Sequence, residues 1–139
     1  MAATADASSP EAALLAIGTA YVHFGLGNPA HYRLMFGSTL TTGKGGLPAV
    51  VAEAAAGAKA VLGEAVLRGA QTGRFAVSPV SQAELDLAVL SAWSLVHGLT
   101  MLAIDGLART DAPSSLPVSL PEHVVESVSR ALIDGLRKR

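Results

Sequence analysis

The stretch from Leu87 to Ile104, LAVLSAWSLVHGLTMLAI, decides the fold because it holds 18 consecutive residues without Asp, Glu, Lys or Arg. An apolar helix of this length is either buried on several sides or spans a membrane. Both flanking charges, Asp86 and Asp105, are acidic rather than basic, and four polar side chains interrupt the run. Membrane spans favour basic flanks. We therefore expect a core helix of a soluble protein.

The segments on either side of this run predict four further helices and no strand. Ser9 and Pro10 form a good helix start, and Gly27-Asn28-Pro29 is a good stop, because Gly and Asn accept a left-handed turn and Pro cannot continue a helix. A capping box, Ser119 to Glu122, opens the last helix. We expect helices over Pro10 to about Leu26, His31 to about Phe36, Pro48 to about Gln71, Ser81 to Ala108, and from the capping box onward.

Helical periodicity also assigns buried faces. In the third helix the apolar stripe comprises Val50, Val51, Ala54, Ala58, Val61, Leu62, Ala65 and Val66, and Glu64 and Arg68 form an i,i+4 pair outside it. In the fifth helix Val124, Val125, Val128, Leu132 and Leu136 lie on one side. The fold class predicted from these patterns is all-α.

Composition excludes several classes of function. The chain has 139 residues, 50% hydrophobic and 15% charged, which suits one globular domain rather than a disordered chain. Ten basic and eleven acidic residues give a net charge of -1, so no electrostatic footprint for nucleic acid is present. The chain has no cysteine, which rules out disulfides and thiolate metal sites.

No motif for catalysis or metal binding stands out. The four histidines lie in four separate segments without metal-ligand spacing. No G-x-S-x-G elbow is present, and the loop Thr41 to Gly46, TTGKGG, lacks the spacing of a phosphate-binding loop. We therefore expect no enzyme activity, no metal and no cofactor.

Two segments are more specific than the composition. Asn28 to Phe36, NPAHYRLMF, resembles a stretch in the C-terminal domain of TetR-type transcriptional regulators, and Trp93 to Gly98, WSLVHG, resembles the signature of their WHG-type subclass. The spacer from Gly69 to Gly73, GAQTG, also matches the usual pattern. The resemblance covers roughly residues 11–138.

The resemblance implies a five-helix bundle that binds a small effector and dimerises through its last two long helices. Residues 1–10 would form a flexible tail and residues 11–139 the effector-binding and dimerisation domain. The family's helix-turn-helix domain is expected to be absent from this chain, so DNA would be contacted only through that missing domain. A cytoplasmic transcription regulator, without membrane contact, is the expected setting.

The fourth helix carries two apolar faces, which indicates two partners, the domain core and a second subunit. The expected lining of an apolar cavity between the first, third and fourth helices is Phe24, Tyr32, Phe36, Leu62, Val66, Trp93, His97 and Met101. The expected dimer interface is Ser91, Leu95, Gly98, Leu102, Val128 and Leu132. A hydrophobic or aromatic effector fits this lining, because burying an unpaired charge is costly. Tyr21 and Met35 are interpreted as core residues.

Two other functions stay open on the sequence. The chain could be a small helical enzyme or carrier for an apolar metabolite, with His97 as the acid–base group. It could also be a dimeric interaction protein without a ligand, in which case the core would be solid and His97 simply a hydrogen-bonded core residue.

Overall fold

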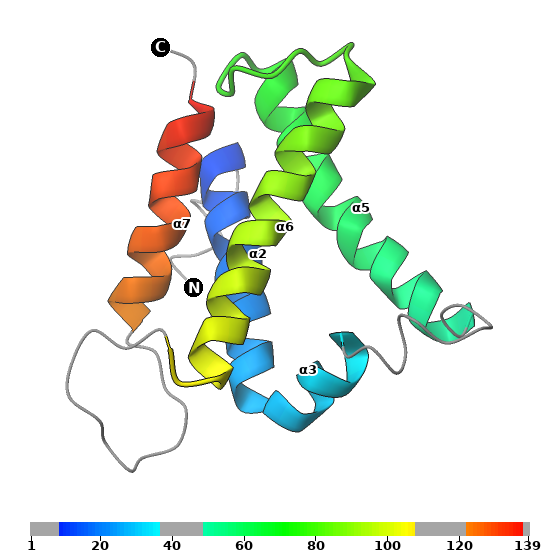
Figure 1. The fold of residues 1–139 in the computed structure, drawn as a ribbon. Helices are drawn as coiled ribbons and strands as arrows, with labels where there is room; N and C mark the ends of the chain where they lie inside the picture. The colour runs from blue at the N-terminus through cyan, green and yellow to red at the C-terminus, as the bar shows by residue number, and fades with distance from the viewer. Residues whose placement is uncertain (1–8, 37–48, 108–121, 138–139) are drawn as a thin grey trace.

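In the computed structural model, residues 9–36, 49–107 and 122–137 are described, and they form five helices without a regular strand (Figure 1). The helices are α2 (Pro10–Gly27), α3 (Pro29–Phe36), α5 (Ala49–Gln71), α6 (Gln82–Ile104) and α7 (Glu122–Leu136). The predicted all-α class is confirmed. The expected tail, the loop with TTGKGG and the capping box at Ser119 lie outside the described residues.

The ends of α2 and α5 follow the local sequence signals. Ser9 caps α2 by accepting a hydrogen bond from the backbone nitrogen of Ala12 at 3.1 Å, and Pro10 occupies the first turn. At the other end, the Asn28 side chain donates to the carbonyl of Phe24 at 3.0 Å, and Pro29 begins α3 at once. Gly73, with φ +69°, closes the turn that follows α5.

Helix α6 is shorter than predicted. It ends at Ile104 rather than at Ala108, because Gly106 adopts a left-handed φ of +74°. The backbone nitrogen of Leu107 then donates to the carbonyl of Leu102 at 2.8 Å and closes the turn. The sequence-based prediction followed the apolar periodicity to Ala108 and gave too little weight to Asp105-Gly106, which is a turn signal.

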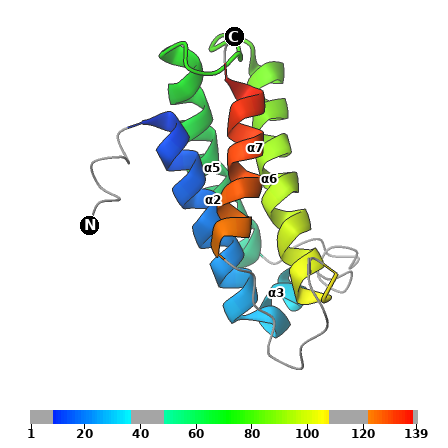
Figure 2. The same ribbon diagram turned by 90° about the vertical axis from the view of Figure 1, so that its left-hand side faces the viewer.

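Helix α2 lies at the centre of the bundle, and α5, α6 and α7 pack around it (Figures 1 and 2). The larger core cluster joins all four of these helices and contains Leu14, Ala65, Val66, Phe75, Ala88, Val89 and Ile133. A smaller cluster of Val22, Leu99 and Val125 lies nearer the other end of α2. Burial of these apolar side chains is the main stabilising contribution.

Helix α5 diverges from the other helices toward its N-terminus (Figure 1). Its expected apolar stripe is wrong at Ala58, which is exposed, and at Val61, which keeps 56% of its surface in solvent. The side chains of Val50, Val51 and Ala54 lie outside the described residues. Ala65 and Val66 are buried as predicted. The expected ion pair between Glu64 and Arg68 is not formed, and the Arg68 Nε atom is buried without a hydrogen-bond partner in the described part of the chain.

Helix α7 buries Val125, Ser129 and Ile133 against the bundle. The predicted apolar side is correct at Val125, but Val124, Val128, Leu132 and Leu136 are only half-buried. The centre of the buried face is shifted, because Ser129 and Ile133, which the prediction omitted, are buried together with Val125. The half-buried valines and leucines form one edge of α7.

The loop between α5 and α6 ties the ends of three helices together. Phe75 forms an isolated antiparallel bridge with Arg137, and the backbone nitrogen of Ala76 donates to the carbonyl of Leu136 at 2.7 Å. Arg74 Nε donates to Glu11 Oε1 at 2.8 Å at the start of α2. Burial of Glu11 acts to raise its pKa, but the hydrogen bond and charge of Arg74 outweigh this and the pKa is lowered.

Among the described helices, α6 alone is long and apolar enough to cross a membrane, with a mean hydropathy of 1.8 over its most apolar window. Length and composition are weak evidence for a span, since a core helix passes the same test. Here α6 packs against α2, α5 and α7, and Thr100 near its C-terminal end is fully buried, with its hydroxyl donating to the Val96 carbonyl at 2.6 Å. These contacts are those of a bundle core helix.

Candidate functional site

Five ring side chains from three helices meet where α3 crosses between α2 and α6. We call them the aromatic cluster: Tyr21 from α2, Tyr32 and Phe36 from α3, and Trp93 and His97 from α6. The ring centroids of Phe36 and His97 are 4.6 Å apart, and those of Tyr32 and Phe36 are 4.8 Å apart. Most pairs are edge-to-face or tilted, which aromatic rings prefer.

Local sequence explains why α3 returns onto α6. The break at Asn28-Pro29 turns the chain, so that α3 runs across the end of the bundle (Figure 2). Gly25 lets α2 approach closely, because a Cβ atom there would collide with Thr100 and lie 3.1 Å from the Tyr32 ring. Arg33 fixes the other side of α3 through a 2.9 Å ion pair with Asp105, just beyond α6.

The cluster is connected by hydrogen bonds. Trp93 Nε1 donates to Tyr21 Oη at 3.1 Å, and the Tyr21 and Tyr32 hydroxyls are 2.9 Å apart. His97 Nδ1 lies 2.5 Å from Tyr32 Oη and 2.9 Å from Tyr21 Oη. Tyr21 Oη therefore contacts three polar groups and is the centre of the network.

Burial keeps the cluster uncharged. It lowers the pKa of His97 below its ordinary value, so the imidazole is neutral at pH 7. Burial and the Tyr21 hydroxyl raise the pKa of Tyr32, which is fully buried, so its hydroxyl keeps its proton. No Asp, Glu, Lys or Arg belongs to the cluster. Its chemistry is therefore that of aromatic faces and neutral hydrogen-bonding groups.

The structure brings together four of the eight residues predicted to line a ligand site: Tyr32, Phe36, Trp93 and His97. Phe24 lies on the same helix as Tyr21, but 46% of its surface is exposed. Met101 is half-buried, one turn beyond His97.

Leu62 and Val66 belong to a different part of the molecule. They pack in the larger core cluster around Leu14, not against the rings. Tyr21, which we interpreted as a core residue, is the member of the site that the sequence analysis missed. The signal was available, because a tyrosine hydroxyl inside an apolar helix needs a hydrogen-bond partner.

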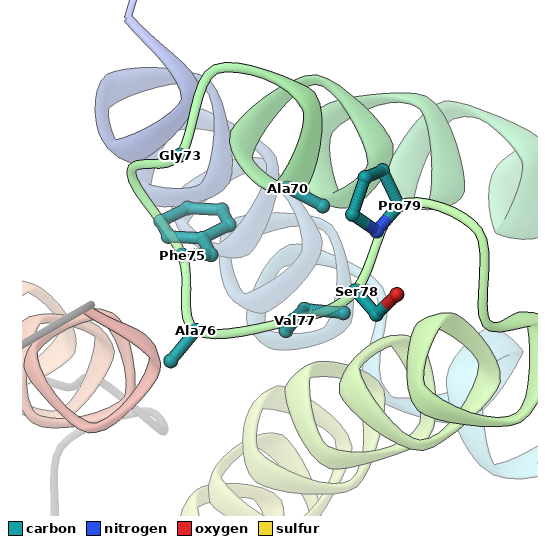
Figure 3. A pocket seen from close by; sticks show the side chains of 7 residues that line it. All are labelled: Ala70, Gly73, Phe75, Ala76, Val77, Ser78 and Pro79. Carbon is teal, nitrogen blue, oxygen red and sulfur yellow. The ribbon is translucent and has the colours of Figure 1, made fainter.

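Two hollows of the described surface lie outside the aromatic cluster. One, of about 290 Å³, lies inside the α5–α6 loop between Ala70 and Pro79 (Figure 3). The other, of about 370 Å³, runs between α5 and α6 and is lined by residues such as Ala60, Leu85 and Asp86. The expected cavity between the first, third and fourth helices is not among these hollows. No group of three His, Asp or Glu that could hold a metal ion occurs in the described ranges.

The predicted interface residues of α6 and α7 range from exposed to half-buried. Ser91 and Leu102 are exposed, the latter by 48%. Leu95, Gly98, Val128 and Leu132 are half-buried. A Cβ atom on Gly98 would meet nothing within 4 Å, so this part of α6 is open.

Comparison with known proteins supplies the family. The family model described as "Tetracyclin repressor-like, C-terminal domain" matches residues 14–127, from the second turn of α2 into α7. No curated protein and no solved structure gives a significant match. The matched range covers most of the chain and includes every residue of the aromatic cluster. The chain belongs to the tetracyclin repressor-like C-terminal domain family.

Proposed function

We propose that this chain is the effector-binding and dimerisation domain of a TetR-like transcriptional regulator, acting in the cytoplasm. The observation that carries the proposal is that α6, which is uncharged from Leu87 to Ile104, has two differently used faces. Trp93 and His97 face α2 and α3 in the aromatic cluster. Leu87 and Leu90, by contrast, keep 63% and 55% of their surface in solvent.

The aromatic cluster is the proposed effector site. It offers ring faces from Phe36 and Trp93 and a neutral hydrogen-bonding network, which is the usual make-up of a small-molecule site. The absence of charge within it favours an uncharged, apolar or aromatic effector, since an unpaired buried charge costs several kcal/mol. Phe24 and Met101 stay candidates at the margin of this site, whereas Leu62 and Val66 pack in the larger core cluster and do not belong to it.

The exposed face of α6 is the proposed dimer interface. Leu87, Ser91, Gly98 and Leu102 recur at helical spacing, and the small residues permit close approach of a second helix. The half-buried edge of α7, with Val128 and Leu132, extends this surface. An obligate interface of two helices from each subunit commonly buries about 2,000 Å² or more.

Effector binding and dimerisation would be linked through α6. An effector that packs between α2, α3 and α6 favours one arrangement of these helices over another. Because α6 is also the dimer helix, this arrangement sets the distance between the two subunits' DNA-binding domains, through which DNA would be contacted. The shift between the two arrangements is set by the difference in the effector's affinity for them.

Trp93 provides the test of effector binding, because it is the only tryptophan. A panel of uncharged apolar and aromatic compounds is titrated while the Trp93 emission is recorded, first on the native chain and then on His97→Ala. We expect at least one compound to change the emission saturably and to bind more weakly to the variant. If no compound changes the emission, effector sensing at this cluster is rejected.

Gly98 provides the test of dimerisation. Gly98→Leu meets open space within one subunit and raises helix propensity, so the subunit itself should fold. Gly57→Leu is the matched control, because Gly57 is also helical and a Cβ atom there also meets nothing within 4 Å, but it lies on α5. In sedimentation equilibrium we expect a dimer for the native chain and the control and a monomer for Gly98→Leu. A monomeric native chain at micromolar concentration would reject the dimer.

A further inference from the structure

We propose that α3 is a cover over the aromatic cluster, hinged at Asn28, and that the ion pair between Arg33 and Asp105 is the latch that sets how often this cover opens. The inference rests on the proposed effector site and adds the way in which a compound enters it. The compound passes α3 while the cover is open, and α3 then closes against the bound molecule.

The aromatic cluster is closed in the structure described above. The ring centroids of Phe36 and His97 are 4.6 Å apart, and those of Tyr32 and Phe36 are 4.8 Å apart, which are the distances of rings in direct contact. A further flat ring between two rings needs about 7 Å, twice the contact distance of two carbon atoms. A compound can therefore pack between the rings of α3 and those of α6 only if the two helices move apart.

Of these two helices, α3 is the one that can move. Helix α6 packs against α2, α5 and α7. Helix α3 has eight residues, and a helix of that length is not stable without support. Within the described ranges, no hydrogen bond between backbone groups joins α3 to α6. Side chains hold it instead: the Tyr32 hydroxyl bonds to His97 and Thr100, and Arg33 bonds to the end of α6.

A single residue, Asn28, joins α3 to α2. Its backbone has φ −136° and ψ 56°, outside the helical region, and Pro29 has no N–H that could bond back into α2. The Asn28 backbone nitrogen and side chain both donate to the Phe24 carbonyl, whereas the Asn28 carbonyl accepts from the Tyr32 nitrogen at 2.8 Å. Figure 1 shows α3 turning away from α2 here. Rotation about the Cα–C bond of Asn28 would thus swing α3 as a unit and leave the end of α2 intact.

The wall beneath the cover keeps hydrogen bonds of its own. Trp93 Nε1 donates to Tyr21 Oη at 3.1 Å, and Tyr21 Oη lies 2.9 Å from His97 Nδ1. These three side chains belong to α2 and α6, which pack against each other directly. When α3 opens, a wall of indole, phenol and imidazole therefore stays in place to receive an aromatic compound.

Arg33 is the attachment of α3 that water and salt can reach. Its guanidinium donates to Asp105 Oδ1 at 2.9 Å and to the carbonyl of Ile104 at 3.3 Å. The side chains of Arg33 and Asp105 are 53% and 46% exposed. An exposed ion pair is weak and is screened by salt. This pair therefore changes how often α3 opens by a small factor, while the buried Tyr32 keeps the cover closed most of the time.

The first arm of the test needs no ligand. Hydrogen exchange of the α3 amides and of the Trp93 indole N–H, which Phe36 covers, reports the opening. In Asp105→Asn we expect both to exchange about two- to fivefold faster, the effect of losing one exposed ion pair. Arg33→Gln also loses the bond to Ile104 and should exceed this. Added salt should speed exchange in the native chain but not in the variants.

Glu126→Gln is the matched control for the latch. Glu126 and Arg130 form a 2.7 Å ion pair on α7, and their side chains are 47% and 59% exposed, as in the latch. We expect this variant to leave the exchange of α3 and of the Trp93 indole unchanged. Native exchange rates in Asp105→Asn would overturn the latch. Equal acceleration in Asp105→Asn and in the control would show a general loosening and would overturn it too.

The second arm holds the cover shut. The chain has no cysteine, so Arg33→Cys combined with Asp105→Cys places two unique thiols at the latch. A short bis-methanethiosulfonate linker joins them, and dithiothreitol removes it. The probe is N-phenyl-1-naphthylamine, an uncharged aromatic compound that absorbs tryptophan emission and so quenches Trp93 when bound. We expect saturable quenching in the native chain and in the variant after linker removal, and none while the linker is in place.

The outcomes separate the two proposals. Equal quenching with and without the linker would overturn the cover and leave the effector site standing, because the compound would then enter without movement of α3. If N-phenyl-1-naphthylamine quenches neither the linked variant nor the native chain, the cover is rejected. The effector site itself is rejected only when the whole panel of compounds leaves the Trp93 emission unchanged.

Discussion

The two ends of the bundle are held together by different means. At one end, which we call the loop end, the α5–α6 loop and the ends of α2 and α7 enclose the larger core cluster, with Phe75 almost fully buried among aliphatic side chains. At the other end, which we call the aromatic end, α3 covers α2 and α6 through rings whose polar atoms bond to one another.

The difference indicates which end carries function. Aliphatic packing stabilises a fold without requiring particular partners, and such packing is sufficient to stabilise the loop end. A part-buried network of hydroxyl, imidazole and indole groups, by contrast, depends on every partner. Packing alone explains the side chains of the loop end, but it does not explain the hydrogen-bonded rings of the aromatic end.

The largest effect is expected at the loop end. Phe75→Ala removes a side chain that is 2% exposed, and we expect the free energy of unfolding to fall by about 3–5 kcal/mol. The emission of Trp93 in the folded variant should stay unchanged, because the cavity forms far from the rings. Val80→Ala is the control in the same loop, with Val80 94% exposed, and should shift stability by less than about 0.5 kcal/mol. Denaturant unfolding measures both, and a control as damaging as Phe75→Ala would contradict the account.

A smaller loss is expected where α2 meets the aromatic end. Gly25→Ala forces a Cβ atom against Thr100 and Tyr32, and such overpacking costs about 1–3 kcal/mol. Gly27→Ala, two residues on, meets open space and should be neutral or slightly stabilising. Thermal unfolding of both variants tests this. Equal stability would mean that α2 does not approach α6 as closely as described.

The two tyrosines of the network should differ from each other. Tyr21→Phe removes the acceptor of Trp93 and a hydrogen-bond partner of Tyr32, so we expect a loss of about 1–2 kcal/mol. Tyr32→Phe should cost less than about 1 kcal/mol, because the Tyr21 hydroxyl, 2.9 Å from Nδ1, can donate to His97 directly. Urea unfolding of both variants measures the difference. A larger loss for Tyr32→Phe would contradict the central position of Tyr21 in the network.

The smallest effect concerns pH. Burial lowers the pKa of His97, so the unfolded chain takes up a proton that the folded chain resists. The stabilisation is therefore complete above about pH 6.5, the unfolded value, and is lost as the pH falls through the folded pKa. The unfolding midpoint should decline from about pH 7 to about pH 5.5 more steeply for the native chain than for His97→Gln. Identical slopes would show that His97 does not contribute.

Local signals in the sequence predicted much of this fold. Ser9-Pro10, Asn28-Pro29 and Gly73 mark helix ends because capping and left-handed turns depend on the residues themselves. The spacing of Trp93 and His97 correctly placed both on one face of α6.

Features that depend on distant partners could not be predicted in this way. Periodicity gives the face of a helix but not the neighbour it meets, so Val66 was grouped with rings that lie at the opposite end of the bundle. The bridge between Phe75 and Arg137 joins residues far apart in sequence, and no local pattern announces it. The central position of Tyr21 arises only once α3 folds back onto α6.

Amide hydrogen exchange with and without a bound compound tests the central claim most directly. A compound that changes the Trp93 emission is added at saturation, and exchange is compared at the two ends of the bundle. The account predicts added protection at the aromatic end, in the C-terminal part of α2, in α3 and in the second half of α6, with little change from Arg74 to Pro79 in the loop end. Protection confined to the loop end, or none at either end, would contradict it.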